Sequence, residues 1–309
     1  MSVRESSRVS RCALHPGYET AFQDLPGLIA TPRRGWIAGI ERSVTTDMTM
    51  TPQHLAELKA AKDTLEHPGL AVKITSLLGK PIERGFELLP KAWNEKIGEV
   101  TREALMAAMK GAVMTMREAP ALTEPTAARR WHKAAVALSG AAGGAFGLPA
   151  LVVELPLSTT IICRSIADIA RANGESPQDL ATRLACLEVF ALGGAAKGDD
   201  AAETGYFAVR ASLAQAVSEA AHYLASHKLA GDGAPALLRL IGLIAARFKL
   251  QVSEKLAAQA VPVVGAAAGA MINLLFIDHF QEMSRGHFTV RRLERLYPPA
   301  LVRREYEQM

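Results

Sequence analysis

This chain of 309 residues has few cysteines, few aromatic residues and almost no excess of one charge. Its three cysteines, Cys12, Cys163 and Cys186, have no close spacing, which excludes a disulfide scaffold or zinc site and indicates free thiols in a reducing compartment. Lysine and arginine total 35 against 31 aspartates and glutamates, an excess too small to predict a nucleic-acid partner. Aromatic residues make up only 6%, so residues that favour strands are few.

Alanine and other apolar residues are abundant instead. Alanine occurs 54 times, and hydrophobic residues make up 49% of the sequence. This content excludes disorder over most of the length, because burying the apolar surface offsets the entropy lost on folding. Alanine has the highest helix propensity, so we expect an all-α fold, a multi-helix bundle formed as a single domain over residues 50–300.

The two ends differ from this body. Residues 1–47 carry six arginines with scattered proline and glycine, and we expect them to be a disordered or non-native extension. They lack an apolar run typical of a secretory signal, and their five acids argue against a transit peptide. A related hypothesis places the start of translation at Met48 or Met50. Residues 301–309 are expected to form a charged tail.

Capping residues and prolines predict where the helices begin. Thr51 is a suitable N-cap and Pro52 suits the first helical position, and Ser176-Pro177 has the same pattern. Apolar residues recur every three or four positions, as expected for helices with one buried face. We predict helices over 51–67, 68–79, 81–89, 90–119, 177–193, 199–227, 234–249, 252–260 and 262–285, then a charged helix over 287–309 broken at Pro298-Pro299.

Two long apolar segments, 134–163 and 256–277, need a separate interpretation, since a membrane span is also apolar. Prolines interrupt both, at Pro149 and Pro156 in the first and at Pro262 in the second. The uninterrupted parts, about fifteen residues each at about 1.5 Å per residue, reach about 22 Å and fall short of a hydrocarbon core of about 30 Å. We therefore expect buried core helices, with membrane insertion or reversible membrane association as the alternative.

Both segments carry glycines four residues apart, a spacing that lets two helix backbones approach closely. The pairs are Gly140/Gly144, Gly143/Gly147 and Gly265/Gly269. We expect the two Gly/Ala-rich apolar helices to pack against each other at the centre of the bundle through these small residues. The other interpretation is that the glycines simply mark turns.

A few polar residues lie among apolar ones and are the candidates for a buried polar site. Arg164 and Asp168 are four residues apart and face the same side of a helix. Glu154 lies upstream of them, on the other side of Pro156. Two carboxylates would balance the charge of a buried arginine between them. Such a group is either a structural ion network or a site for a ligand or a proton. Asn273 falls on the Gly269 face of the second segment, where we expect it to hydrogen-bond a neighbouring helix.

Other polar groups support weaker predictions. Asp199, Asp200 and Glu203 form an acidic cluster that suits a helix N-terminus better than a cation site. Asp278-His279 closes the second apolar segment and is predicted to be a solvated helix-end pair and not a site. The sequence has no Gly-x-Ser-x-Gly, His-Glu-x-x-His, P-loop or Gly-x-Gly-x-x-Gly motif, so no reaction, metal or cofactor is predicted.

Several short runs, spread over residues 50–300, carry a family resemblance. The runs are Gly147-Leu148-Pro149-Ala150, Glu154-Leu155-Pro156, Arg164-Ser165-Ile166-Ala167-Asp168, Thr182-Arg183-Leu184, Glu188-Val189-Phe190, Gly193-Gly194 and Ala260-Val261-Pro262-Val263-Val264-Gly265 with Asn273. Together they resemble the EcsC protein family of bacteria. The resemblance implies an α-helical intracellular protein with an accessory role near the membrane, because the family name comes from a gene neighbour of an ABC transporter. Some family members carry hydrolase or peptidase labels, but this sequence contains no nucleophile–base pair to support them.

The predicted function is therefore a non-enzymatic helical interaction protein, a membrane-associated or ABC-transporter-linked accessory factor. A membrane surface or a membrane protein is the expected partner. The expected location is the cytoplasm, peripheral to the inner face of the membrane. The alternative is a peptidase-like hydrolase or a small-ligand-binding protein whose site contains Glu154, Arg164 and Asp168, with Asn273.

Overall fold

The computed structural model describes residues 49–66, 69–78, 83–89, 93–115, 132–137, 151–194, 205–226, 235–260 and 266–309. All regular elements within these ranges are helices, which confirms the predicted all-α fold. In chain order they are α1 (Pro52–Glu66), α2 (Leu70–Leu78), α3 (Glu83–Leu88), α4 (Trp93–Thr115), α6 (Leu151–Ala172), α7 (Leu180–Glu188), the short 3-10 helix η3 (Val189–Ala191), α9 (Tyr206–Ser226), α10 (Pro235–Ala260), α11 (Ala266–Leu296) and α12 (Pro299–Gln308). Residues 132–137 are also helical.

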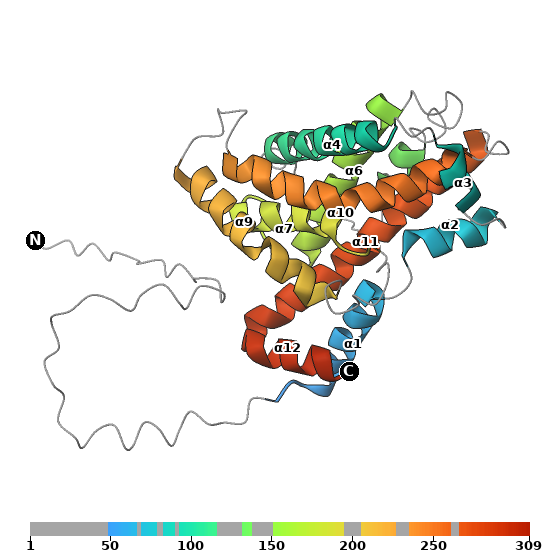
Figure 1. The fold of residues 1–309 in the computed structure, drawn as a ribbon. Coiled ribbons are helices and arrows are strands. Elements are labelled where there is room, and N and C mark those ends of the chain that lie inside the picture. The colour runs from blue at the N-terminus through green and yellow to red at the C-terminus, as the bar shows by residue number, and fades with distance from the viewer. Residues whose placement is uncertain are drawn as a thin grey trace, which may run out of the picture.

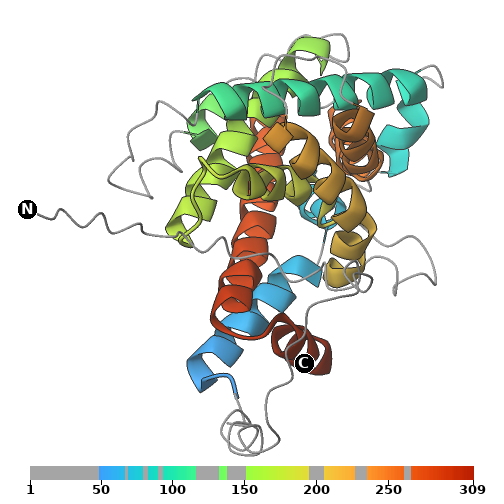
Figure 2. The same cartoon turned by 90° about the vertical axis from the view of Figure 1, so that its left-hand side faces the viewer.

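The longest of these helices, α11, connects the two ends of the molecule. It packs against α2, α6 and α10 and also against α1 and α12. Figure 1 and Figure 2 show α4 across the top of the molecule, where it contacts α6 and α10. At the opposite end, α1 and α12 lie beside α11 and contact each other. Helices that are far apart in the sequence therefore meet on α11.

The start of α1 follows the predicted cap. The backbone amide of His54 donates a hydrogen bond to Thr51 Oγ1 (3.3 Å), so the threonine side chain satisfies one free amide of the first turn. Leu58, Ala61 and Leu65 face the interior at the three- and four-residue spacing of one helix face. The sequence thus predicts both the first residue of this helix and its buried side.

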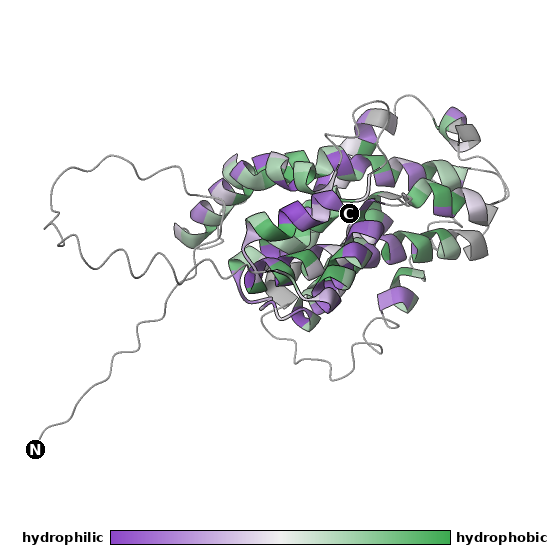
Figure 3. Ribbon diagram, turned by 90° about the horizontal axis from the view of Figure 1, so that it is seen from below, coloured by the Kyte–Doolittle hydropathy of each residue, from purple (hydrophilic) through white to green (hydrophobic). Residues whose placement is uncertain are grey.

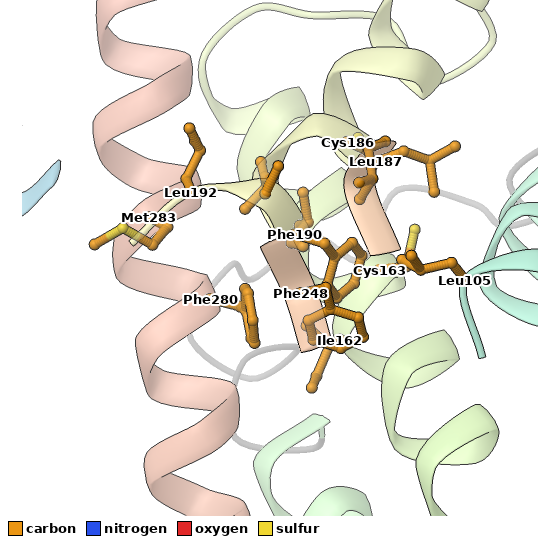
Figure 4. Close-up of a cluster of buried hydrophobic side chains, with 14 of the residues drawn as sticks. Leu105, Ile162, Cys163, Cys186, Leu187, Phe190, Leu192, Phe248, Phe280 and Met283 are labelled. Atoms are coloured by element: carbon orange, nitrogen blue, oxygen red, sulfur yellow. The ribbon is translucent and has the colours of Figure 1, made fainter. Parts of the chain in front are cut away.

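The core between η3, α10 and α11 is built around phenylalanines. Phe190, Phe248 and Phe280 approach one another with ring centroids 5.1, 5.1 and 5.5 Å apart. Figure 4 shows these rings near Cys163 and Cys186, which lie on α6 and α7. Both thiols are free and buried, and burial raises the pKa of Cys163 to about 12. These two cysteines are therefore unreactive packing residues at neutral pH.

The predicted start at Ser176-Pro177 is wrong, since α7 begins at Leu180 with Asp179 as its N-cap. Three further predicted helix ends are also wrong. Pro156 lies within α6, because a proline in the second turn removes only one backbone hydrogen bond from the helix. α10 runs without a break through residues 250–251, where the sequence predicts two helices. α11 continues past Asp278 and His279; Asp278 pairs with Lys133, and His279 is buried rather than solvated. In each case tertiary packing overrides a local signal for a helix end.

The described parts of the two apolar segments lie in residues 134–137 and in α6, α10 and α11. Within the described ranges, no helix is both long enough and apolar enough to cross a bilayer. Figure 3 shows hydrophobic and hydrophilic residues alternating along the helices seen from below. Gly269 is buried in α11, whereas the other glycines of the predicted pairs lie outside the described residues. The close packing of two glycine-containing helices therefore stays a prediction.

The structure describes the C-terminal end of the chain and not residues 1–48. Residues 1–47 lie outside the described residues, so the extension and the start of translation stay predictions. Residues 301–308 belong to α12, which buries Val302 and Tyr306. The charged residues of this segment lie on the other sides of the same helix, where Arg303 and Glu307 form an exposed ion pair.

Candidate functional site

Three buried polar side chains from three helices meet at Glu154. Glu154 lies in the first turn of α6, Lys255 on α10 and Asn273 on α11. Lys255 Nζ donates hydrogen bonds to both carboxylate oxygens, at 2.9 Å to Oε1 and 2.7 Å to Oε2. Asn273 Nδ2 donates to Glu154 Oε1 (2.8 Å) and to the backbone carbonyl of Val136 (3.0 Å). We call Glu154, Lys255 and Asn273 the buried triad.

The charge state of the triad follows from these contacts. Burial raises the pKa of Glu154, but the positive charge of Lys255 and hydrogen bonds from Lys255, Asn273 and Ser158 outweigh burial and lower the pKa below its usual value. Lys255 Nζ also lies 4.8 Å from the centroid of the Phe276 ring, whose face attracts a cation. Glu154 and Lys255 therefore form an ionised pair inside the helical bundle. Hydrogen bonds and the Phe276 ring enclose this pair.

These contacts restrict what Glu154 can do chemically. A general base needs a carboxylate oxygen that can reach a proton of the substrate. Both oxygens of Glu154 accept hydrogen bonds from within the protein, and only 5% of the side chain is exposed. The arrangement favours a structural role, in which the triad holds α6, α10 and α11 in one relative position.

The predicted ion network between Glu154 and Asp168 is wrong. Arg164 is half-buried and forms no ion pair with any described residue. Asp168 pairs with Arg171 Nη1 through Oδ1 (2.9 Å) and with His132 Nε2 through Oδ2 (2.9 Å). About fourteen residues, or about 21 Å of helix, separate the two carboxylates on α6, so one arginine cannot bridge them.

Asn273 makes the predicted contact with neighbouring helical segments, whereas sequence reasoning missed Lys255. A signal for the lysine exists, since Lys255 follows Phe248 and Val252 at the spacing of the buried face of α10. Lysine is almost never fully buried without a partner. A lysine on an otherwise apolar helix face therefore indicates a buried carboxylate elsewhere in the chain.

A second polar cluster lies between α9 and α11. Arg210 forms a bidentate ion pair with Glu294, with nitrogen–oxygen distances of 2.8 and 3.1 Å. Tyr206 Oη lies 3.4 Å from Arg210 Nη1 and 3.1 Å from His287 Nδ1. Burial raises the pKa of Tyr206 and lowers that of His287, so both rings are neutral at physiological pH.

The loop before α7 joins this cluster through Glu175. Arg291 donates to its two carboxylate oxygens from Nε (2.9 Å) and Nη2 (3.1 Å), and Thr182 Oγ1 donates a further hydrogen bond (2.8 Å). Burial raises the pKa of Glu188, which ends α7, although the charges of Arg210 and Arg291 oppose the rise. Both arginines are thus paired with carboxylates, and the cluster is an ionic seam between helices.

One buried histidine has unusual surroundings. Neither ring nitrogen of His279 has a hydrogen-bond partner among the described residues. Burial, together with the positive charge of Lys73, lowers the pKa of His279 to about 3. The ring lies beside Gly193, in the bend that follows η3. His279 is therefore a neutral packing residue, and only its position on a buried helix face distinguishes it in the sequence.

The weaker acidic cluster of Asp199, Asp200 and Glu203 lies outside the described residues. In the part of the chain that the structure describes, no three histidine, cysteine or carboxylate side chains converge as metal ligands would. Ionic clusters at Glu154, Arg210 and Asp168 therefore join helices in the described part of the chain.

The comparison with protein families identifies the chain. A model of the EcsC protein family matches residues 52–293. The chain belongs to this family. The EcsC region extends from the start of α1 through most of α11 and contains the complete buried triad. Neither the curated proteins nor the solved structures include a significant match to this EcsC chain.

Proposed function

We propose that this EcsC-family chain is a non-enzymatic interaction protein that serves as an accessory factor at a membrane. Two features support the proposal. Glu154, the most buried carboxylate of the predicted site, has both oxygens occupied by Lys255 and Asn273. In addition, α10 presents apolar side chains to solvent and so offers a surface for a partner.

The observation that carries the proposal is the outer side of α10, where leucines are exposed among charged residues. Its inner face buries residues such as Ile244 and Phe248. Its outer face, which we define by Leu238, Leu243 and Leu250, leaves these side chains 42%, 40% and 42% exposed. The solvent side of a surface helix is typically polar, so three exposed leucines on this side stand out. Their shared exposure on one side of the helix favours an interaction site there.

The alternative function, a hydrolase or small-ligand-binding protein, has less support. It requires Glu154 and Asp168 to act on the same small molecule. The two carboxylates lie about 21 Å apart on α6, and each is bound by its own cation. The alternative predicts that Glu154→Gln folds normally and loses activity or ligand binding.

Density-gradient flotation of the full chain with cell membranes tests the proposal. We expect a substantial fraction of the protein to float with the membranes. A protein that stays entirely at the bottom of the gradient would contradict the proposal. Thermal unfolding of Glu154→Gln separates the two functions, because a structural triad predicts loss of stability, whereas intact folding with loss of a measured activity favours the alternative.

A further inference from the structure

We infer that the outer face of α10 binds the surface of an anionic lipid bilayer. This inference rests on the proposed function and names the partner of the same surface. Successive residues of an α-helix are rotated by about 100°, so Leu238, Leu243 and Leu250 fall within an arc of about 140°. Three leucines within such an arc can enter the boundary between headgroups and acyl chains together.

The charges of α10 match an anionic surface. From Pro235 to Leu250 the helix contains Arg239, Arg247 and Lys249 and no acidic residue. Arg239 pairs with Glu219 of α9, but its side chain remains 55% exposed, and an exposed pair of this kind is weak. Long cationic side chains can lie along apolar surface and still reach headgroup phosphates while the leucines enter the bilayer.

The position of α10 in the fold suits contact with a flat surface. Exposed residues of α10 occur only in its first sixteen residues, 235–250, and this part lies along the outside of the bundle, with α4 and α9 packed against the helix (Figure 1). At about 1.5 Å per residue this part is about 24 Å long. A long helix at the periphery can lie parallel to a membrane without any rearrangement of the core.

The same charges argue against a second copy of this chain as the occupant. A twofold interface brings the same surface of both copies together. Over residues 235–250, the cations of two outer faces would then approach each other without an acid from the same stretch between them, and like charges across an interface are unfavourable. An anionic bilayer supplies the opposite charge along residues 235–250.

Vesicle flotation with the purified full chain tests this inference. The vesicles contain phosphatidylcholine alone or phosphatidylcholine mixed with phosphatidylglycerol. We expect binding to the mixed vesicles, weaker binding to phosphatidylcholine alone, and release by salt. Leu243→Glu combined with Leu250→Glu should reduce partitioning by more than about tenfold, since each charge near an anionic surface changes binding by about fivefold.

Two further variants control for folding and for general stickiness. Val153→Glu with Leu157→Glu adds the same charges at exposed positions of α6, outside α10, and should leave binding unchanged. Arg247→Ser with Lys249→Ser keeps the leucines and should weaken both the binding and its salt dependence. Circular dichroism of each variant confirms that the helices are intact.

The outcomes separate the inference from the proposed function. Equal flotation of the wild type and the Leu243→Glu/Leu250→Glu variant would overturn the inference and leave the proposed function standing. Flotation with cell membranes but not with protein-free vesicles would mean that the outer face of α10 binds a membrane protein. This result would also overturn the inference. A wild-type chain that binds neither would contradict both.

Discussion

The imidazole of His279 occupies the space that a side chain at Gly193 would need. A Cβ atom at Gly193 would lie 2.6 Å from His279 Cε1 and 2.7 Å from Met283 Sδ. Gly193 also has a φ of +72°, a left-handed conformation that other residues adopt only with strain. The bend after η3 and the middle of α11 are therefore matched to each other atom by atom.

Replacing Gly193 with alanine should lower the free energy of unfolding by about 2 to 5 kcal/mol, because the left-handed conformation and the overlap with His279 both oppose it. Chemical denaturation measures the change. Gly242→Ala on α10 is the matched control, since nothing lies within 4 Å of its Cβ position. In a helix interior this change should stabilise by up to about 1 kcal/mol. Similar effects at the two positions would contradict the packing described here.

The buried triad predicts strong coupling between Glu154 and Lys255. Either single change, Glu154→Leu or Lys255→Met, should destabilise the protein by about 3 to 5 kcal/mol, because each leaves one buried charge without its partner. The double variant should lose far less than the sum, and a double-mutant cycle measures the difference. The exposed pair Arg303–Glu307 serves as the control and should show no measurable coupling. Additive losses at Glu154 and Lys255 would refute the coupling.

Asn273 offers a test that depends on pH. Asn273→Ala removes hydrogen bonds to Glu154 and to the Val136 carbonyl and should cost about 1 to 3 kcal/mol. Asn273→Asp places a second carboxylate against Glu154 with Lys255 as the shared cation, so it should destabilise more than alanine at neutral pH. The difference between the two variants should shrink in acid, because protonating one carboxylate removes the repulsion. A difference that does not change with pH would show that the two carboxylates do not interact.

The lowered pKa of His279 predicts a loss of stability in mild acid. The unfolded chain binds a proton at this ring below about pH 6.5, whereas the folded protein does so only near pH 3. The free energy of unfolding should therefore fall as the pH drops below 6.5. In His279→Gln this fall should be smaller, and in the surface control His222→Gln it should match the wild type. A wild-type slope in His279→Gln would contradict the burial of a neutral ring.

Helix content and helix faces could be predicted from the sequence because they depend on local spacing. Thr51 caps α1, and its buried residues follow the apolar period. The predicted helix ends were wrong where tertiary packing determines whether a helix continues, at Pro156 inside α6 and at Asp278-His279 inside α11. A local signal for a helix end costs little when the residues on both sides are held by the core.

The candidate site was predicted in part for the same reason. Glu154 and Asn273 are conspicuous because they interrupt apolar runs, and the structure brings them together. Arg164 was assigned to them because it is close in sequence, whereas the true cation, Lys255, is 101 residues away. No local spacing identifies a partner at that distance.

The docking of α1 on α11 also determines when the chain can fold. His54 Nδ1 lies 2.8 Å from Tyr297 Oη, and Glu57 pairs with Arg292, across more than 230 residues of sequence. While the polypeptide is being made, the leucines of α1 have no docking surface until nearly all of it has left the ribosome. Synthesis must therefore be almost complete before the apolar face of α1 is buried. A nascent chain arrested earlier would expose this face to chaperones and proteases.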